Sequence, residues 1–179
     1  MNPITFVDLK TQADILGKDI RQAMEQVMSH GRFIMGPEVY ELEQKLSEFT
    51  GAKHVVSCSS GTDALLMALM AIDVGPGDAV FTSPFTFVAT AEVISLLGAT
   101  PVFVDITKDT FNIDPVKLAL AVDHIDKNHA GKSLTPKCIL PVDIFGLPAE
   151  YDAILGIADQ YGLVVVEDAA QSLGGRIDD

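Results

Sequence analysis

The chain has 179 residues, of which 48% are hydrophobic, so it can bury one sizeable core and is expected to be globular. Twelve Lys and Arg stand against 25 Asp and Glu, giving a formal charge of −13, and no basic run suits a nucleic-acid partner. The apolar stretches are too short to span a membrane, the N-terminus lacks a signal-peptide pattern, and the cysteines and histidines form no metal-binding pattern, so we expect a cytoplasmic protein without metal or membrane anchor.

Two amphipathic helices are predicted first. Residues 11–29 carry apolar side chains at close to helical spacing. After a turn, Pro37 stands where the first turn of a helix tolerates proline, and a second helix is predicted over 38–49. Gly51 ends that helix. Residues 1–52 are therefore interpreted as N-terminal helices that precede the core.

Residues 53–179 are predicted to form an α/β core in which strands and helices alternate. The strands are apolar throughout, as expected for a parallel sheet with helices on both faces. The predicted strands cover residues 54–58, 79–83, 101–105, 138–142 and 163–167. The predicted helices cover residues 61–72, 86–97, 115–122 and 149–161. The polar segment 123–137 is interpreted as a surface loop.

In open parallel sheets, ligands bind at the carboxyl ends of the strands, so the residues that follow each strand are candidates for a site. The motif SCSSGTDAL follows the first predicted strand and opens a helix. Its free N–H groups and helix dipole favour a phosphate, and its hydroxyls add donors. Alternatively, Ser60 or Thr62 caps the helix and Asp63 complements its dipole; for this motif alone, capping is the favoured interpretation.

The second candidate is SPFTFVATAEVI, which ends another predicted strand. Phe85 and Phe87 open the following helix, where an aromatic ring could stack on a flat ligand. Packing of both rings in the core is equally compatible with the pattern. A flat heteroaromatic molecule that carries a phosphate would satisfy the first two motifs together.

The third candidate is VVVEDAAQSLGG, in which Glu167 and Asp168 end a buried strand. An ionised carboxylate there needs a cation or several donors to offset its desolvation, and a protonated ring nitrogen is such a cation. Gln171, three residues further on, could donate a hydrogen bond to a ring oxygen. The alternative is that Asp168 caps a helix over AAQSL while Glu167 faces solvent.

Together, the motifs GRFIMGPEVYELE, SSGTDALLMAL, GPGD, SPFTFVATAEVI, GATPVFVDI and VVVEDAAQSLGG resemble the N-terminal part of the DegT/DnrJ/EryC1/StrS sugar aminotransferases. The resemblance covers essentially the whole chain. It implies the large domain of a pyridoxal-phosphate (PLP) enzyme of the aspartate-aminotransferase fold (fold type I), a three-layer, wound, mostly parallel sheet. The last strands and the C-terminal small domain would be absent from residues 1–179.

The resemblance also implies roles for individual residues. Asp168 would pair with the pyridine nitrogen of PLP, Gln171 would bind its phenolic oxygen, and Phe87 would stack on the ring. The phosphate would be held by the amides of Gly61, Thr62 and Asp63 and by the Thr62 hydroxyl. The sugar-nucleotide entrance would be lined by Gly36, Pro37 and Glu38.

The implied reaction is transfer of an amino group through PLP and its amine form (PMP), with glutamate as donor and a keto sugar nucleotide as acceptor. A UDP-3-keto sugar acid used in surface polysaccharide synthesis and a homodimeric enzyme are the expected substrate and assembly. One alternative is a sugar dehydratase of the same family, in which histidine replaces the lysine. Another is a non-catalytic α/β binding module.

Two features depart from the family pattern. The fourth predicted strand is followed by PVDIFG, with Asp143 and Phe145, where the family has a His or Ser before Leu-Tyr-Gly. No lysine of the chain lies in the motif for the Schiff-base lysine, which is expected beyond Asp179. Without that lysine the chain lacks its covalent anchor and proton shuttle, so we expect a portion of a longer enzyme, inactive on its own and with a gap in its sheet.

Overall fold

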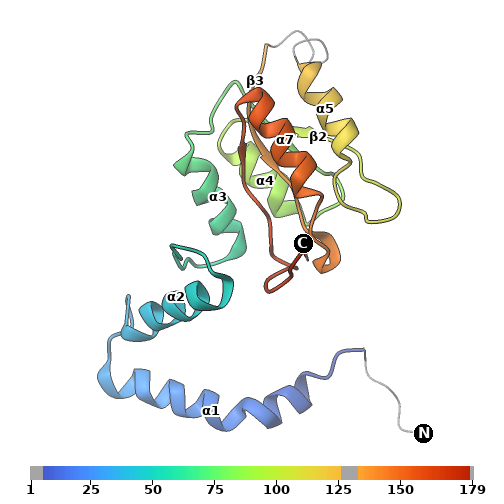
Figure 1. The fold of residues 1–179 in the computed structure, drawn as a ribbon. Coiled ribbons are helices and arrows are strands. Elements are labelled where there is room, and N and C mark those ends of the chain that lie inside the picture. The colour runs from blue at the N-terminus through green and yellow to red at the C-terminus, as the bar shows by residue number, and fades with distance from the viewer. Residues whose placement is uncertain (1–5, 126–132, 178–179) are drawn as a thin grey trace, which may run out of the picture. The chain divides into compact units, whose positions relative to one another are not determined.

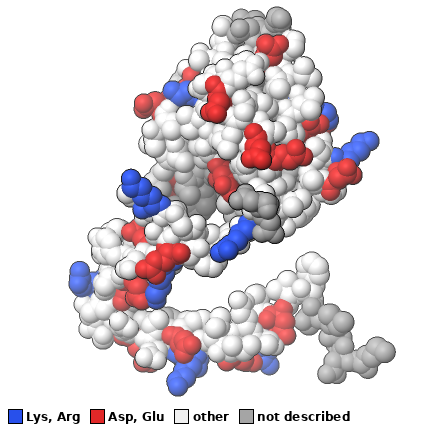
Figure 2. Space-filling model, in the orientation of Figure 1, with Lys and Arg blue, Asp and Glu red and all other residues white. Residues whose placement is uncertain are grey.

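The computed structural model describes residues 6–125 and 133–177 (Figure 1). The chain divides into two compact units, Met1–Ser57 and Cys58–Asp179. In the part of the chain that is described, no helix combines the length and the apolar character that crossing a bilayer requires. On the face drawn in Figure 2, Lys and Arg side chains are interspersed with Asp and Glu.

The first unit contains two helices whose ends follow ordinary capping chemistry. Helix α1, Leu9–His30, begins after Asp8, whose side chain accepts a hydrogen bond from a first-turn amide. It ends at Gly31, which has a left-handed backbone. Helix α2, Pro37–Thr50, begins at its proline and ends at Gly51, also left-handed. Both predicted helices are thus confirmed.

The second unit is built on a four-stranded sheet of order β2-β1-β3-β4, in which every pair is parallel. Its strands are β1 (Asp78–Thr82), β2 (Thr100–Phe103), β3 (Thr135–Leu140) and β4 (Val164–Val165). Helix α3 (Gly61–Ala71) precedes β1. Helices α4 (Val88–Leu96), α5 (Pro115–Asp123) and α7 (Tyr151–Tyr161) connect successive strands, and a short 3-10 helix, η1 (Ile144–Gly146), precedes α7. The predicted α/β class with a parallel sheet is confirmed.

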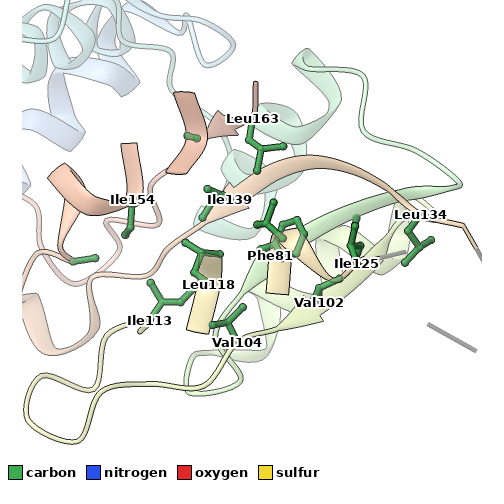
Figure 3. Close-up of a cluster of buried hydrophobic side chains, with 14 residues drawn as sticks. Phe81, Val102, Val104, Ile113, Leu118, Ile125, Leu134, Ile139, Ile154 and Leu163 are labelled. Atoms are coloured by element: carbon green, nitrogen blue, oxygen red, sulfur yellow. The ribbon is translucent and has the colours of Figure 1, made fainter. Parts of the chain in front are cut away.

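The two faces of the sheet bury two separate cores, because successive side chains of a strand point to opposite faces. On one face, Phe81 and Ile139 pack with Leu118 of α5 and Ile154 of α7 (Figure 3). The other core joins alternate strand residues to α3 and α4. Its fully buried members are Leu69, Val80, Val93, Ile94, Cys138 and Leu140. Helices therefore cover both faces, and the unit has three layers, as predicted.

One predicted strand is wrong. Residues 54–58 form no strand, because none of the described strands pairs with them. Their polar groups are satisfied locally instead: the Glu43 carboxylate accepts hydrogen bonds from both the amide and the hydroxyl of Ser57, each at 2.8 Å. An apolar run becomes a strand only where a neighbour completes its hydrogen-bond ladder.

Two other predicted boundaries shift. The predicted strand 163–167 shrinks to Val164–Val165, followed by an isolated bridge between Val142 and Asp168. The predicted loop 123–137 is shorter than expected, because α5 extends to Asp123 and β3 begins at Thr135. The first residues of β3 pair with β1 in the sheet. This pairing makes them a strand although the segment is polar. Residues 126–132 of that loop lie outside the described part.

Candidate functional site

The carboxyl ends of the strands and the start of α3 lie at the same end of the second unit. Helix α3 packs on the sheet and its last residue, Ala71, precedes β1 by a short turn, so α3 runs antiparallel to β1. The start of α3 at Gly61 is therefore at the edge where the strands end, and the C-terminal turns lie at this end too (Figure 1). The topology thus brings the three candidate motifs to one edge.

Asp168 is buried at this edge, with only 8% of its surface exposed. Its amide donates to Pro141 O at 2.9 Å, which fixes it beside the end of β3. One carboxylate oxygen accepts a hydrogen bond from the fully buried Thr90 hydroxyl at 2.8 Å, and the other accepts from the Ala170 amide at 3.3 Å. Within the described ranges Asp168 forms no ion pair, so a buried carboxylate is held only by neutral donors.

The alternative that Asp168 caps a helix is wrong. The segment AAQSL forms hydrogen-bonded turns, in which Ser172 N donates to Ala169 O at 3.1 Å and Gly175 N donates to Ser172 O at 2.7 Å. Asp168 closes only a local turn with the Ala170 amide. Its burial therefore needs another explanation than helix capping.

Gln171 has a defined amide orientation. Its Oε1 accepts a hydrogen bond from the Phe145 amide at 2.6 Å. A backbone amide can only donate, so the side-chain atom that faces it must be the oxygen. The Gln171 NH₂ group is thereby left as a donor. Phe145 reaches this position with a left-handed backbone, φ 58°, and the next residue, Gly146, has no room for a Cβ because Gln171 O would lie 2.9 Å away.

Neither phenylalanine of the second motif is packed in the core. Phe87 lies directly before α4 and is 73% exposed. Phe85 is 41% exposed and joins an aromatic cluster with Phe111 and Phe145, with ring centroids 5.6 to 6.0 Å apart. A shallow pocket of about 180 Å³ lies beside this cluster, between Pro84 and Ile144. Of the two alternatives left open by the sequence, packing of both rings in the core is thus wrong, and an exposed ring is present at Phe87.

The start of α3 combines a cap with open donors. The Ser60 hydroxyl accepts a hydrogen bond from the Asp63 amide at 3.1 Å, so the predicted N-cap is present. The Asp63 carboxylate accepts from the hydroxyls of Ser59 and Ser60, and the hydrogen bond from Ser59 is the largest cause of its lowered pKa. The amides of Gly61 and Thr62 occupy the first helical positions, where no intrahelical acceptor exists. These two amides, rather than that of Asp63, remain available to an anion.

The burial and the hydrogen bonds of Asp143, at this same edge, were not predicted from the sequence. Asp143 is 1% exposed and accepts three hydrogen bonds. One carboxylate oxygen binds Ala149 N at 2.9 Å and the Tyr151 hydroxyl at 2.8 Å, and the other binds the Ser172 hydroxyl at 2.9 Å. Its position after an apolar strand, like that of Asp168, is the signal that could have indicated it.

Carboxylates crowd around this point. The pKa of Glu167 is raised to about 7. Lost hydration of its carboxyl group is the largest cause, although the residue is exposed, and the neighbouring Asp143 carboxylate is the next cause. The pKa of Tyr151 is raised well above its usual range by burial, by its hydrogen bond to Asp143, and by the charges of Asp143, Glu167 and Asp168. This edge of the sheet therefore attracts a cation.

Gly36, Pro37 and Glu38 lie in the first unit, so their role at a substrate entrance stays a prediction. Gly36 has no room for a side chain, because a Cβ would lie 2.4 Å from Arg32 O. Glu38 contacts His30 Nε2 at 2.9 Å, and this hydrogen bond is the largest cause of its lowered pKa. The turn is thus well defined locally.

Known proteins resemble this chain over almost its whole length. The UDP-2-acetamido-2-deoxy-3-oxo-D-glucuronate aminotransferase of Pseudomonas aeruginosa is 49% identical over 96% of this chain and 45% of its own length. The UDP-N-acetyl-3-dehydro-alpha-D-glucosamine 3-aminotransferase of Acidithiobacillus ferrooxidans is 39% identical over 97% of this chain and 44% of its own length. The chain thus spans less than half the length of these relatives.

Solved structures match the fold as well. A DegT DnrJ EryC1 StrS aminotransferase from Brucella abortus superposes with a TM-score of 0.89 and 47% identity, over 95% of this chain and 45% of that one. NtdA from Bacillus subtilis, solved with bound cofactor PMP, has a TM-score of 0.83 and 32% identity, over 97% of this chain and 38% of that one. Residues 14–179 match the profile of one family over almost the whole chain. The chain belongs to the DegT/DnrJ/EryC1/StrS aminotransferase family.

Proposed function

We propose that this chain forms the cofactor-binding side of a PLP-dependent enzyme that transfers an amino group to a keto sugar nucleotide. The observation that carries the proposal is Asp168, a buried carboxylate that pairs with no cation among the described residues. The protonated ring nitrogen of PLP would supply the missing positive charge. The two donors from Thr90 and Ala170 aim the carboxylate without neutralising it.

The other residues of the edge fit the remaining parts of PLP. The Gln171 NH₂ group, left as a donor by its bond to Phe145, would bind the phenolic oxygen. The exposed ring of Phe87 would cover one face of the pyridine. The amides of Gly61 and Thr62 with the Thr62 hydroxyl would hold the phosphate at the start of α3, and Asp63 would support that turn through its serine contacts.

When bound, PLP supplies an electron sink and a carrier for the amino group. The part of this chain is to keep the ring nitrogen protonated at Asp168, which lets the ring accept electron density. The Gln171 donor and the Phe87 ring fix the plane of the cofactor. The covalent lysine is proposed beyond Asp179, and residues 1–179 alone are expected to be inactive.

The proposed acceptor is a UDP-3-keto sugar acid, with glutamate as the amino donor, in surface polysaccharide synthesis. The names of the two enzyme relatives, both acting on UDP-sugars oxidised at carbon 3, support this choice. We further propose that a homodimer completes the site and that Gly36, Pro37 and Glu38 line the entrance for the sugar nucleotide. We specifically expect the amino group to be transferred to the keto group at carbon 3 of the sugar, rather than to a ketone at another carbon.

The test uses the full-length protein with PLP, a UDP-3-keto sugar acid and isotopically labelled glutamate. Mass spectrometry of the sugar product is expected to show one labelled nitrogen in place of the keto oxygen. Asp168→Asn is expected to lower the rate by at least about a hundredfold, because it removes the charge opposite the ring nitrogen.

The matched control is Asp159→Asn, an exposed carboxylate of α7, which should leave the rate unchanged. A product that has lost water and gained no nitrogen would contradict the proposal in favour of a dehydratase. Absence of any PLP binding would contradict the cofactor itself.

A further inference from the structure

Asp143 links the segments that carry the cofactor-facing residues. Its amide donates to Asp168 O at 3.2 Å, and its carboxylate binds the Ser172 hydroxyl just after Gln171. The other carboxylate oxygen holds Ala149 N and the Tyr151 hydroxyl at the start of α7. The loop between these anchors contains the backbone amide that orients Gln171. One side chain thus ties together the η1 loop, α7 and the turn that follows Asp168.

These hydrogen bonds alone do not account for a charged residue. An asparagine would accept from Ala149 N and from the Tyr151 hydroxyl through its oxygen, and it would donate to the Ser172 oxygen through its NH₂ group. A buried carboxylate is more costly than an amide in the same place, because its hydration is lost. Among the described residues no ion pair offsets that cost. The negative charge itself therefore needs a function.

The surroundings of Asp143 increase that cost. Three side chains that carry ionisable groups share its site: Tyr151 from α7, and Glu167 and Asp168 from the segment that follows β4. The uptake of a proton by Glu167 near pH 7 relieves part of the repulsion. A cation held at Asp168 would relieve more, since it would attract both buried carboxylates.

We propose that Asp143 is a positioning residue that acts through Asp168, and that its negative charge raises the proton affinity of the ring nitrogen bound there. This inference rests on the proposed function, because it requires PLP or PMP at Asp168. It predicts selectivity for the protonated pyridine over a ring of the same shape that cannot carry the proton. A merely structural role would stabilise both ligands equally.

The experiment compares PLP with its carbocyclic analogue, in which a C–H group replaces the ring nitrogen. Dissociation constants of both are measured on the full-length protein at a pH above the Glu167 pKa of about 7, so that Glu167 is deprotonated in every measurement. Asp143→Asn is expected to weaken PLP binding about tenfold and to leave the analogue unchanged. Equal weakening of both ligands, or no change in either, overturns the proposal.

A second neutral variant, Asp143→Ser, removes the same charge with a smaller side chain and keeps the test valid if the amide variant fails to fold. It is expected to lose the same selectivity. Two other outcomes would show that the proposed function is wrong. The wild-type protein would fail to bind PLP, or Asp168→Asn would leave PLP binding unchanged. If Asp168→Asn weakens PLP binding but the Asp143 variants keep the preference for PLP over the analogue, only the inference about Asp143 is overturned.

Discussion

Two acidic regions of the second unit differ in how their charges are satisfied. On the surface, the Asp105 carboxylate lies 2.7 Å from Lys117 Nζ, and this hydrogen bond is the largest cause of the lowered pKa of Asp105. At the carboxyl edge of the sheet, Asp143 and Asp168 are buried, and their carboxylates are bound, within the described part of the chain, by hydroxyls and amides alone. The exposed carboxylate pairs with a cation, whereas the buried ones pair with none of the described Lys, Arg or His side chains.

The presence or absence of a paired cation distinguishes a carboxylate with a structural role from one that can bind a ligand. An exposed ion pair is screened by water and contributes little, so its loss is tolerated. A buried carboxylate with only neutral partners keeps an unfavourable charge that a ligand can compensate. The comparison therefore supports the proposed cofactor site at the carboxyl edge, rather than a site at the exposed ion pairs.

The largest effect is expected for Thr90→Val, which removes the hydroxyl bound to Asp168 while nearly keeping the shape of the side chain. Both groups are buried, so the carboxylate loses a donor that water cannot replace. We expect the free energy of unfolding to fall by about 1–3 kcal/mol. Denaturant unfolding measures this change. Thr90→Ser is the control, since it keeps the hydroxyl and loses only the methyl group. A Thr90→Val variant as stable as the wild type would show that the donor to Asp168 does not contribute.

An intermediate effect is expected from Glu167→Gln. The folded-state pKa of Glu167, about 7, lies above its ordinary value of 4.5, so the folded protein holds a proton that the unfolded chain releases. The stabilisation from this proton is complete below about pH 4.5 and is lost as the pH rises through about 7. The glutamine side chain has no such proton to lose as the pH rises. The midpoint temperature of unfolding should therefore fall less in this variant than in the wild type over this pH window.

Thermal unfolding between these pH values measures that difference. Glu92→Gln, on the exposed side of α4, is the control and should follow the wild type. In Asp143→Asn the pH dependence should weaken, because Asp143 is one cause of the raised pKa of Glu167. A wild type and a Glu167→Gln variant with parallel pH curves would refute the coupling.

The smallest effect is expected from Lys117→Met, which breaks the surface pairs with Asp105 and Asp114. Unfolding should change slightly at low salt and not at all at high salt, because ions already screen exposed charges. Binding of PLP should be unaffected. A salt-independent loss of stability would show that this pair resembles the buried carboxylates after all.

Local patterns predicted the helices well, because their limits depend on neighbouring residues. Gly31 and Gly51 end α1 and α2 as left-handed caps, and Pro37 starts α2. The strand predicted at 54–58 failed, since a strand also requires a partner distant in sequence. Apolar composition alone does not say whether such a partner is available.

In the candidate site, too, features set by neighbouring residues could be predicted, and features set by distant residues could not. The burial of Asp168 follows from its place after an apolar strand, and the Ser60 cap follows from a local motif. The donor from Thr90 joins residues 78 positions apart, so no local pattern indicates it. Asp143 was noted for its departure from the family pattern, yet its bond to Ser172 spans 29 positions and required the fold.

The two cysteines differ in chemical reactivity, which makes the start of α3 accessible to labelling. Cys138 lies in the core, and its burial raises the pKa of its thiol to about 12, so few thiolate anions form at neutral pH. Cys58 is exposed and its Sγ donates to Ser60 O, in the turn that leads into α3. A thiol-reactive fluorophore should therefore attach at a single point, two residues before the N-cap serine, and report directly on anions that arrive there.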